Sequence, residues 1–338
     1  MNTLSIGENI DLQPFNTLAL PARARYFAAI DTTDHLTEAL NWAQTKKLPL
    51  LVIGGGSNII LRGTWPGLVL QIALQGKKMQ RGNEHASVTV AAGENWHALV
   101  QWSLHEQLFG LENLTLIPGT AGAAPIQNIG AYGVELSQFL HAVRGYSLDE
   151  KSIIELSAED CRLGYRDSIF KHALRDRFVI TEVVLALRTQ FAPVVSYPAL
   201  REKLQGGAVT AQRIEQAVRA IRQSKLPNPA QLPNAGSFFK NPVVTAAHYA
   251  ELAARHIGLP QFQAPNGIKV PAAWLLDRAG WKGQRRGHVG VHAEQALVLI
   301  NYGGGDADEL LELAQAIQAD VQHRFGVTLE LEPNVYGN

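Results

Sequence analysis

The sequence contains little cysteine and no excess of charge of either sign. Among its 338 residues, Cys161 is the one cysteine, so no disulfide can form within the chain and a reducing compartment is indicated. Thirty basic residues balance 30 acidic ones, which argues against a dedicated nucleic-acid or membrane-surface binder. We therefore expect neither nucleic acid nor membrane among its partners.

Long apolar runs are also missing. No window approaches the ~18 apolar residues of a membrane span, and the N-terminus has no basic stretch followed by an apolar run, so no signal peptide is expected. His288 and His292 are four residues apart, but HVGVH does not match the HExxH template, and we predict no metal site. Cys161 is expected to be a small buried hydrophobe rather than a nucleophile. These absences favour a cytoplasmic protein.

Signals of strands and helices alternate along the chain, and the length suggests roughly two domains or three small ones. Strands are predicted at 48–53, 59–61, 86–92, 143–148 and 178–187. Helices are predicted at 34–46, with Asp34 as cap, at about 97–107, with Gly110 beyond its end, and at 306–323, between Asp306 and Gly326. Three prolines in residues 226–236 indicate a loop at a domain boundary.

A first glycine-rich loop, GGGSN, stands between two predicted strands. It consists of Gly54, Gly55, Gly56, Ser57 and Asn58. Consecutive backbone N–H groups of such a loop can converge on an anion, but a tight turn between strands explains the loop equally well. No Lys-Ser/Thr follows, which excludes a Walker loop, and the strand that follows argues against a dinucleotide fingerprint.

A second uncharged stretch, IPGTAGAAPIQNIGAYG at 117–133, is rich in glycine and alanine. Small side chains allow a large flat ligand to approach the backbone, and Gln127 and Asn128 offer donors and acceptors to a heteroaromatic edge. The two loops together suit a dinucleotide with a polar ring, held mostly by main-chain groups. A Gly/Ala-rich packing segment is the alternative.

The residues that could carry chemistry are few, and spacing does not choose among them. Ser237, in NAGSFFKNP, is either a turn residue or a reacting group. For each charged side chain, a solvated charge or a surface ion pair is the common alternative. The charged candidates and their neighbouring tyrosine are Tyr165, Arg166, Asp167, Lys171, Lys225, Lys240, Lys282, Arg285, Arg286 and Glu332.

Several segments together resemble the type I class of the UDP-N-acetylenolpyruvoylglucosamine reductase family. They are GGGSNIIL, AGENWHALV, GLENLTLIPGTAGAAPIQNIGAYGVEL, CRLGYRDSIFK, KLPNP, NAGSFFKNP, WLLDRAGWKG and QALVLIN. The resemblance implies an α+β protein with the FAD-binding fold of the vanillyl-alcohol-oxidase type. Two FAD-binding subdomains would occupy residues 1–72 and 73–226. A C-terminal α+β substrate domain would occupy 227–338, and its last strand could return to the FAD-binding part.

The resemblance also implies an activity. Members of this family reduce UDP-N-acetyl-3-O-(1-carboxyvinyl)glucosamine to UDP-N-acetylmuramate, a precursor of peptidoglycan, with non-covalent FAD as cofactor and NADPH as co-substrate. Besides this UDP-sugar and NADPH no partner is expected, and the protein is predicted to be a monomer.

Site residues follow from the same resemblance. Ser237 matches the proton donor, Arg166 the cation that stabilises the enol intermediate, and Glu332, seven residues after Phe325, its acidic partner. Besides the GGGSN loop, the implied FAD contacts are Pro118, Gly119, Gly122, Ala124, Pro125, Ile126, Gln127, Asn128, Gly130, Ala131, Tyr132 and Gly133. The implied substrate contacts are Tyr165, Tyr197, Lys225, Asn241, Lys282 and Gln295. Arg285 and Arg286 are further candidate cations for the diphosphate.

Two positions depart from the family pattern. Ala124 stands where a serine is common, so a hydroxyl contact to the flavin phosphate is in doubt. Asn334 stands where an arginine is common. Two other functions stay open: a different flavin oxidase or dehydrogenase on the same fold, and a non-catalytic nucleotide-sugar binding protein.

Overall fold

The computed structural model describes residues 3–337, which form two compact units. The first unit comprises the described residues up to Ile10, Ala24–Gly56 and Pro66–Ser224. The second comprises Asp11–Arg23, Ser57–Trp65 and the described residues from Lys225 onward. Two N-terminal segments thus belong to the same unit as the C-terminal part. The predicted division of residues 1–226 into two FAD-binding subdomains stays a prediction.

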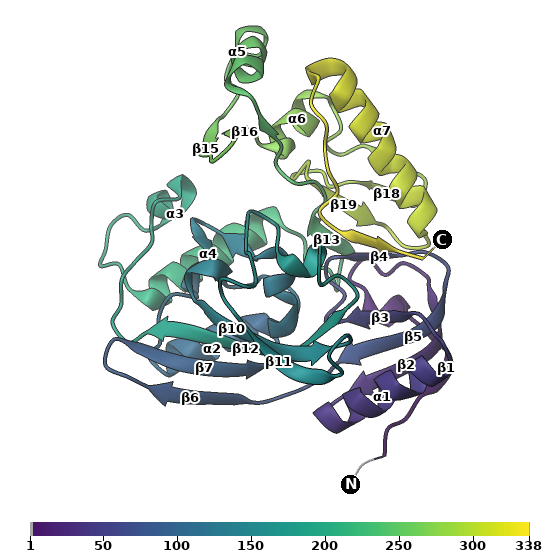
Figure 1. Ribbon diagram of the computed structural model, residues 1–338. Helices are drawn as coiled ribbons and strands as arrows, with labels where there is room; N and C mark the ends of the chain where they lie inside the picture. The colour runs from purple at the N-terminus through teal and green to yellow at the C-terminus, as the bar shows by residue number, and fades with distance from the viewer. Residues whose placement is uncertain (1–2, 338) are drawn as a thin grey trace. The chain divides into compact units, whose positions relative to one another are not determined.

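Two sheets form the framework of the first unit (Figure 1). The four-stranded sheet has the order β1-β2-β5-β3, with β1 (Gly7–Asp11), β2 (Arg23–Ile30), β5 (Thr64–Ile72) and β3 (Leu50–Ile53). The five-stranded sheet has the order β11-β10-β12-β7-β6, with β11 (Ser152–Ser157), β10 (Leu140–Ser147), β12 (Phe178–Arg188), β7 (His85–Ala91) and β6 (Lys77–Arg81). Neighbours in the five-stranded sheet are antiparallel, and β3 pairs with β5 in parallel.

The helices of the first unit are α1 (Thr33–Thr45), α2 (Trp96–His105), α3 (Pro198–Lys203) and α4 (Ala211–Lys225). The first two lie close to the predicted ranges, and no range was predicted for α3 or α4. The predicted cap Asp34 is wrong: Thr32 caps α1 by accepting from the N–H of His35, and Asp34 lies in the first turn. Gly110 does not end α2 either, since the helix stops at His105 and Gln107 already has the left-handed conformation (φ 54°).

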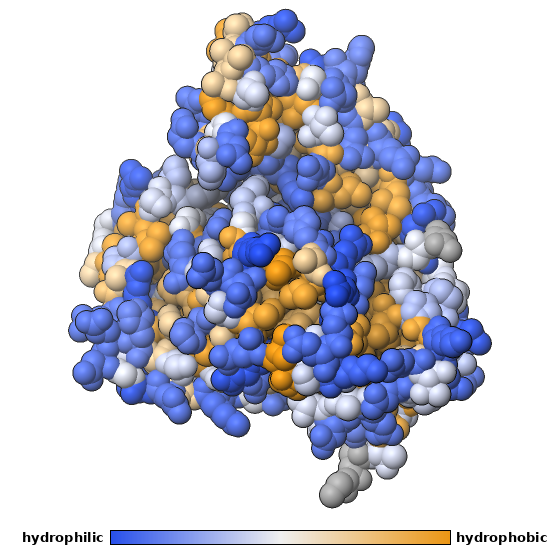
Figure 2. Space-filling view, viewed as in Figure 1, coloured by the Kyte–Doolittle hydropathy of each residue, from blue (hydrophilic) through white to orange (hydrophobic). Residues whose placement is uncertain are grey.

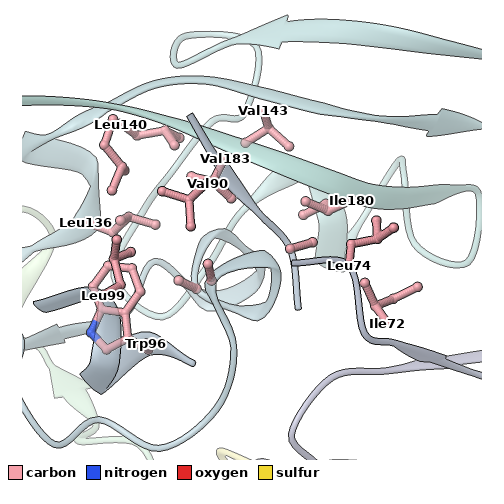
Figure 3. Close-up of a cluster of buried hydrophobic side chains, with 14 of the residues drawn as sticks. Ile72, Leu74, Val90, Trp96, Leu99, Leu136, Leu140, Val143, Ile180 and Val183 are labelled. Atoms are coloured by element: carbon pink, nitrogen blue, oxygen red, sulfur yellow. The ribbon is translucent and has the colours of Figure 1, made fainter. Parts of the chain in front are cut away.

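Apolar side chains of α2 and of the five-stranded sheet make the core of the first unit (Figure 3). Trp96 and Leu99 of α2 gather with Val90 and Val183 of the strands in this cluster. The indole N–H of Trp96 donates to the carbonyl of Leu114 at 3.0 Å, so that this buried donor is satisfied. Ala121, Ala124 and Ile129 of the stretch 117–133 belong to the same core, which therefore supports that stretch.

The second unit is built mainly from short strands and three helices. The strands are β4 (Ile59–Leu61), β13 (Asn234–Ser237), β14 (Val243–Val244), β15 (Phe262–Ala264), β16 (Gly267–Lys269), β17 (Arg285–Arg286), β18 (Val289–Val291), β19 (Val298–Asn301) and β20 (Asn334–Tyr336). The helices are α5 (Ala246–Arg255), α6 (Ala272–Arg278) and α7 (Ala307–Phe325). Asp306 caps α7, as predicted, and Gly326 ends it in the left-handed conformation.

The strands of the second unit form three sheets. The largest has the order β13-β19-β18-β17, and α7 lies beside it (Figure 1). The others are β14-β16-β15 and the parallel pair β20-β4. Phe238 and Phe239, both fully buried, belong to the core of this unit. On the face shown in Figure 2, hydrophilic residues predominate and hydrophobic ones form small separate groups.

Candidate functional site

The two glycine-rich loops predicted from the sequence lie against each other in the first unit. A Cβ atom added to Gly54 would lie 2.5 Å from Oγ1 of Thr120, and one added to Gly55 would lie 3.1 Å from Cα of Gly119. On its other side the second loop packs at the end of β7, where a Cβ on Gly122 would lie 2.5 Å from Cβ of Ala92, the residue after the strand. A side chain at Gly54 or Gly122 would force its neighbour to shift, and one at Gly55 would be unusually tight, so glycine suits these close approaches. The bare backbone of this region fits the phosphates of a dinucleotide.

Asn128 organises the second loop. It is buried and has the left-handed conformation (φ 45°). Its amide donates to Glu135 Oε2 at 3.0 Å and to the carbonyl of Gly164 at 2.9 Å, and its carbonyl accepts from the N–H of Ser137. Both groups of the amide are thus used within the protein, so Asn128 positions the loop. The predicted contact with a flavin edge stays a prediction.

Arg166 is tied to the same loop. Its Nη2 donates to the carbonyl of Gly130 at 2.9 Å, and Lys171 donates to the carbonyl of Arg166 itself. Ser168 adds a link at 2.6 Å to the carbonyl of Ile126. Arg166 has the left-handed conformation (φ 53°), which costs about 1 kcal/mol for a non-glycine residue and is held here by these bonds. The structure therefore brings the predicted catalytic cation to the predicted cofactor loop.

Two tyrosines lie next to this loop. The rings of Tyr132 and Tyr197 pack edge to face, with centroids 5.0 Å apart. Tyr132 is a third left-handed residue (φ 51°), and its carbonyl accepts from the amide of the buried Asn113, which also donates to Val194. Burial raises the pKa of Tyr132, while Arg222 acts to lower it. Tyr132 therefore stays a neutral phenol at neutral pH.

Ser237 ends strand β13 in the second unit. Asn234, buried at the start of that strand, donates to the carbonyls of Pro227 and Leu232 and accepts from the N–H of Gly236. The pairing of β13 with β19 shifts register between Asn234 and Ser237, and Gly236 has a positive φ (71°). This irregularity fixes the half-buried Ser237 at the end of the proline-rich loop.

Glu332 lies on the chain segment that pairs with the residues after Ser237. Its N–H donates to the carbonyl of Phe238 at 2.9 Å, and Phe239 forms an antiparallel bridge with Leu331. The amide of Asn58 donates to the carbonyl of Glu332 at 3.2 Å. Backbone pairing thus places Glu332 opposite Phe238, the residue that follows Ser237. Arg166 belongs to the first unit and is described there.

The predicted substrate contacts are spread over both units. Tyr165 is exposed and its ring lies 5.5 Å from the guanidinium of Arg166, and Lys225 is the exposed last residue of α4. Asn241 accepts from the N–H of Ala272 at the start of α6. Lys282 is 3.7 Å from Asp277, and Gln295 is half-buried in the turn before β19.

Other candidates have structural partners. Lys240 pairs with Glu330 at 2.9 Å, and Arg285 and Arg286 stack on the rings of Tyr302 and Trp281. Cys161 is fully buried, as predicted, and burial raises the pKa of its thiol to about 12, so little of the nucleophilic thiolate forms at neutral pH. Residues 3–337 contain no group of three or more His, Cys, Asp or Glu side chains that could hold a metal ion. No helix in this described range is long and apolar enough to cross a membrane.

Arg222, in the last turn of α4, is a further candidate that was not predicted from the sequence. Electrostatic interactions join it to Tyr132 and Arg166. The signal was its spacing: it follows the buried Ile221 and stands four residues after the buried Val218. Such a position lies at the edge of the apolar face, where a charged side chain is only partly exposed.

Comparisons with known families match both parts of the chain. A family model described as FAD binding domain matches residues 24–148. A second, described as the C-terminal domain of UDP-N-acetylenolpyruvoylglucosamine reductase, matches residues 228–336. The close approaches at Gly54, Gly55 and Gly122, here called the glycine cradle, fall within the first match. Ser237 and Glu332 fall within the second.

Relatives and solved structures agree with these matches. A protein named UDP-N-acetylenolpyruvoylglucosamine reductase from Paraburkholderia phymatum is 49% identical, over 95% of each chain. One of the same name from Pseudomonas fluorescens is 44% identical over 99% of this chain and all of its own. The crystal structure of the enzyme of that name from Thermus caldophilus superposes with a TM-score of 0.71 at 24% identity, covering 99% of this chain and 100% of that one.

A further structural neighbour has a different name. 6-Hydroxy-D-nicotine oxidase from Arthrobacter nicotinovorans superposes with a TM-score of 0.55 at 14% identity, over 97% of this chain and 87% of its own. The predicted fold class is confirmed: an FAD-binding fold of the vanillyl-alcohol-oxidase type with a C-terminal α+β domain.

Proposed function

Because the chain belongs to the UDP-N-acetylenolpyruvoylglucosamine reductase family, we propose that it reduces UDP-N-acetyl-3-O-(1-carboxyvinyl)glucosamine to UDP-N-acetylmuramate with electrons from NADPH. The observation that carries the proposal is 49% identity to a reductase of this name over nearly the full length of both chains. The protein is an FAD-containing oxidoreductase. We place this reaction in the cytoplasm and assign it to a monomer with non-covalent FAD.

The residues of this chain have distinct tasks in the proposed reaction. When bound, FAD supplies the hydride that reaches C3 of the vinyl group. Negative charge then builds on C2 and on the neighbouring carboxylate as an enolate. Arg166, fixed by its bond to the carbonyl of Gly130, binds the carboxylate in a bidentate manner and stabilises this charge. Losing one such donor costs about 10²–10³ in rate.

Ser237 gives its hydroxyl proton to C2, which completes the reduction of the double bond. A hydroxyl is a weak acid, but a carbanion-like centre is a strong base, so a positioned serine suffices. Phe238 and Phe239, both fully buried, hold the backbone at this point. Glu332, whose N–H donates to Phe238, is the acidic partner of the enol intermediate.

The remaining predicted residues bind ligands in this proposal. Tyr197 covers the substrate, and Lys225 and Lys282 meet its diphosphate. Tyr165, Asn241 and Gln295 complete the substrate contacts. The glycine loops, which approach each other at Gly55 and Gly119, hold the FAD phosphates, with main-chain N–H groups in place of the hydroxyl that Ala124 lacks.

A pair of half-reaction assays on Ser237→Ala tests the function and the role of the serine together. NADPH should still bleach the flavin of the variant at nearly the wild-type rate. The enolpyruvyl UDP-sugar should restore the colour about 10²–10⁴-fold more slowly, the range for loss of a general acid. Normal turnover by the variant would remove Ser237 from the mechanism. Wild-type protein that binds no FAD, or that the enolpyruvyl substrate cannot reoxidise, would overturn the function itself.

A further inference from the structure

Arg222 is a cation in the last turn of α4 whose surroundings are mostly apolar. Leu200, Ile214, Val218 and Ile221 form a buried cluster on this part of the unit, and Tyr132 and Tyr197 pack against the cluster. Arg222 follows Ile221 directly and is itself only half-exposed. The aliphatic part of the side chain can pack there, but a guanidinium in such a place is costly unless it binds an acceptor.

The described part of the protein supplies no acceptor for one N–H group of Arg222. Nε of Arg222 is buried and has no hydrogen-bond partner among residues 3–337. The neighbouring Arg219, one turn earlier, shows the ordinary arrangement, since it pairs with the buried Glu215 at 2.5 Å. Native proteins rarely leave a buried donor unpaired. The Nε–H of Arg222 is therefore available to an acceptor from outside the chain.

The charged groups around Arg222 point to an anion. Burial lowers the pKa of Arg222, and the positive charge of Arg166 lowers it further, while Tyr132 acts in the opposite direction. Two guanidinium groups that act on each other repel, and an anion bound by both removes the repulsion. Arg166 already lies at the loop 125–133 through Gly130. Arg222 directly follows Ile221, whose cluster Tyr132 packs against, and Gly130 lies two residues before Tyr132. Both guanidinium groups are therefore anchored around the loop 125–133.

We propose that Arg222 is a second catalytic cation, which binds the carboxylate of the substrate together with Arg166 and stabilises the enolate. This proposal rests on the proposed reduction and specifies its charge-binding site. A carboxylate has two oxygens with about four acceptor positions, enough for one N–H pair from Arg166, the Nε of Arg222 and the hydroxyl of Tyr132. As charge spreads from C2 into the carboxylate, a desolvated guanidinium stabilises it more than water would.

The experiment compares two ligands that differ in the lactyl ether, which carries the carboxylate, and it needs no turnover. Oxidised, FAD-loaded protein is titrated with UDP-N-acetylmuramate, which carries the carboxylate, and with UDP-N-acetylglucosamine, which lacks it. Binding is followed by calorimetry for the wild type, Arg222→Gln, Arg222→Lys and the control Arg213→Gln. Arg213 lies on the same helix and donates to the loop carbonyls of Leu204 and Ala208.

We expect Arg222→Gln to weaken UDP-N-acetylmuramate binding roughly 10- to 100-fold, the range for one charge-assisted bond pair. UDP-N-acetylglucosamine should bind as to the wild type. Arg222→Lys should lose part of the preference for the ligand with a carboxylate, because lysine keeps the charge without the planar guanidinium. If Arg222→Gln does not fold, Arg222→Lys provides the test instead. Arg213→Gln should change neither affinity.

Three results would overturn the proposal. Equal weakening for both ligands would place Arg222 at the diphosphate or in the scaffold. Unchanged affinities would show that it binds no ligand. A changed flavin midpoint potential with unchanged UDP-N-acetylmuramate binding would assign it to the cofactor. Because both titrations use oxidised protein, they stand whether or not the enolpyruvyl substrate turns over, so failure of the proposed function is recognised separately.

Discussion

Replacing Asn234 by alanine tests how one buried amide positions the proposed proton donor. The side chain is 2% exposed and makes three hydrogen bonds, at 3.1 Å to the carbonyl of Pro227, 2.8 Å to that of Leu232 and 2.9 Å from the N–H of Gly236. A typical bond contributes about 0.5–1.5 kcal/mol. The three groups left behind are half-buried, so water can reach them. We therefore expect the second unit to lose about 2–4 kcal/mol of unfolding free energy.

Asn234→Ala should also slow the proposed proton transfer from Ser237. The bond to Gly236 fixes the irregular register between β13 and β19 that precedes Ser237. Displacements of about 1 Å can cost on the order of 10²-fold in rate. We expect reoxidation of the flavin by the substrate to slow at least tenfold at temperatures where the variant is folded, with reduction by NADPH little changed.

Urea unfolding followed by circular dichroism gives the stability, and stopped-flow absorbance gives the two half-reactions. Asn228→Ala is the matched control, because Asn228 is an exposed residue of the same loop that accepts one bond, from the N–H of Ala230. It should cost less than about 1 kcal/mol. A loss below about 0.5 kcal/mol for Asn234→Ala, or a loss equal to that of the control, would refute the reasoning.

Three further changes test other parts of the structure. Gly122→Ala should force the second glycine loop away from β7, at a cost of about 1–3 kcal/mol, and release FAD on gel filtration, whereas exposed Ala123→Ser should retain it; full retention by the alanine variant contradicts the cradle. Burial and the charge of Arg219 lower the pKa of His97, against the opposing effect of Glu215, and its Nδ1 accepts from the N–H of Leu116. The folded protein thus prefers neutral His97, so stability should fall as pH drops below about 6.5, with a slope of at most about 1.4 kcal/mol per pH unit. In urea unfolding between pH 7.5 and 5.5 the slope should be smaller for His97→Gln, and equal slopes would exclude this histidine. Finally, a thiol reagent at pH 8 should label Cys161 only after denaturation, since burial raises its pKa to about 12; labelling of the native protein would contradict this.

Much of the fold was readable from local patterns. The strands at 86–92 and 178–187 and the helix that ends at Gly326 were predicted because hydrophobic periodicity and capping residues act over a few neighbours. The errors were local too. Thr32 rather than Asp34 caps α1, because both are acceptable caps and only the backbone conformation decides.

The sequence by itself determined the family, the cofactor class and the identity of the residues proposed to react, since GSFFKNP and the two glycine loops are specific motifs. Tertiary structure decided which other segments each of those residues contacts and which hydrogen-bond partners it has. Long-range pairing placed Glu332 beside Phe238 and assigned residues 11–23 and 57–65 to the same unit as the C-terminal part. It also decided which charges are satisfied: Lys240 has Glu330, whereas Nε of Arg222 lacks an acceptor within residues 3–337. Satisfaction of a buried charge depends on distant segments meeting in space. Helical spacing therefore places Arg222 at the edge of the apolar face of α4, but it does not show that Nε lacks an acceptor.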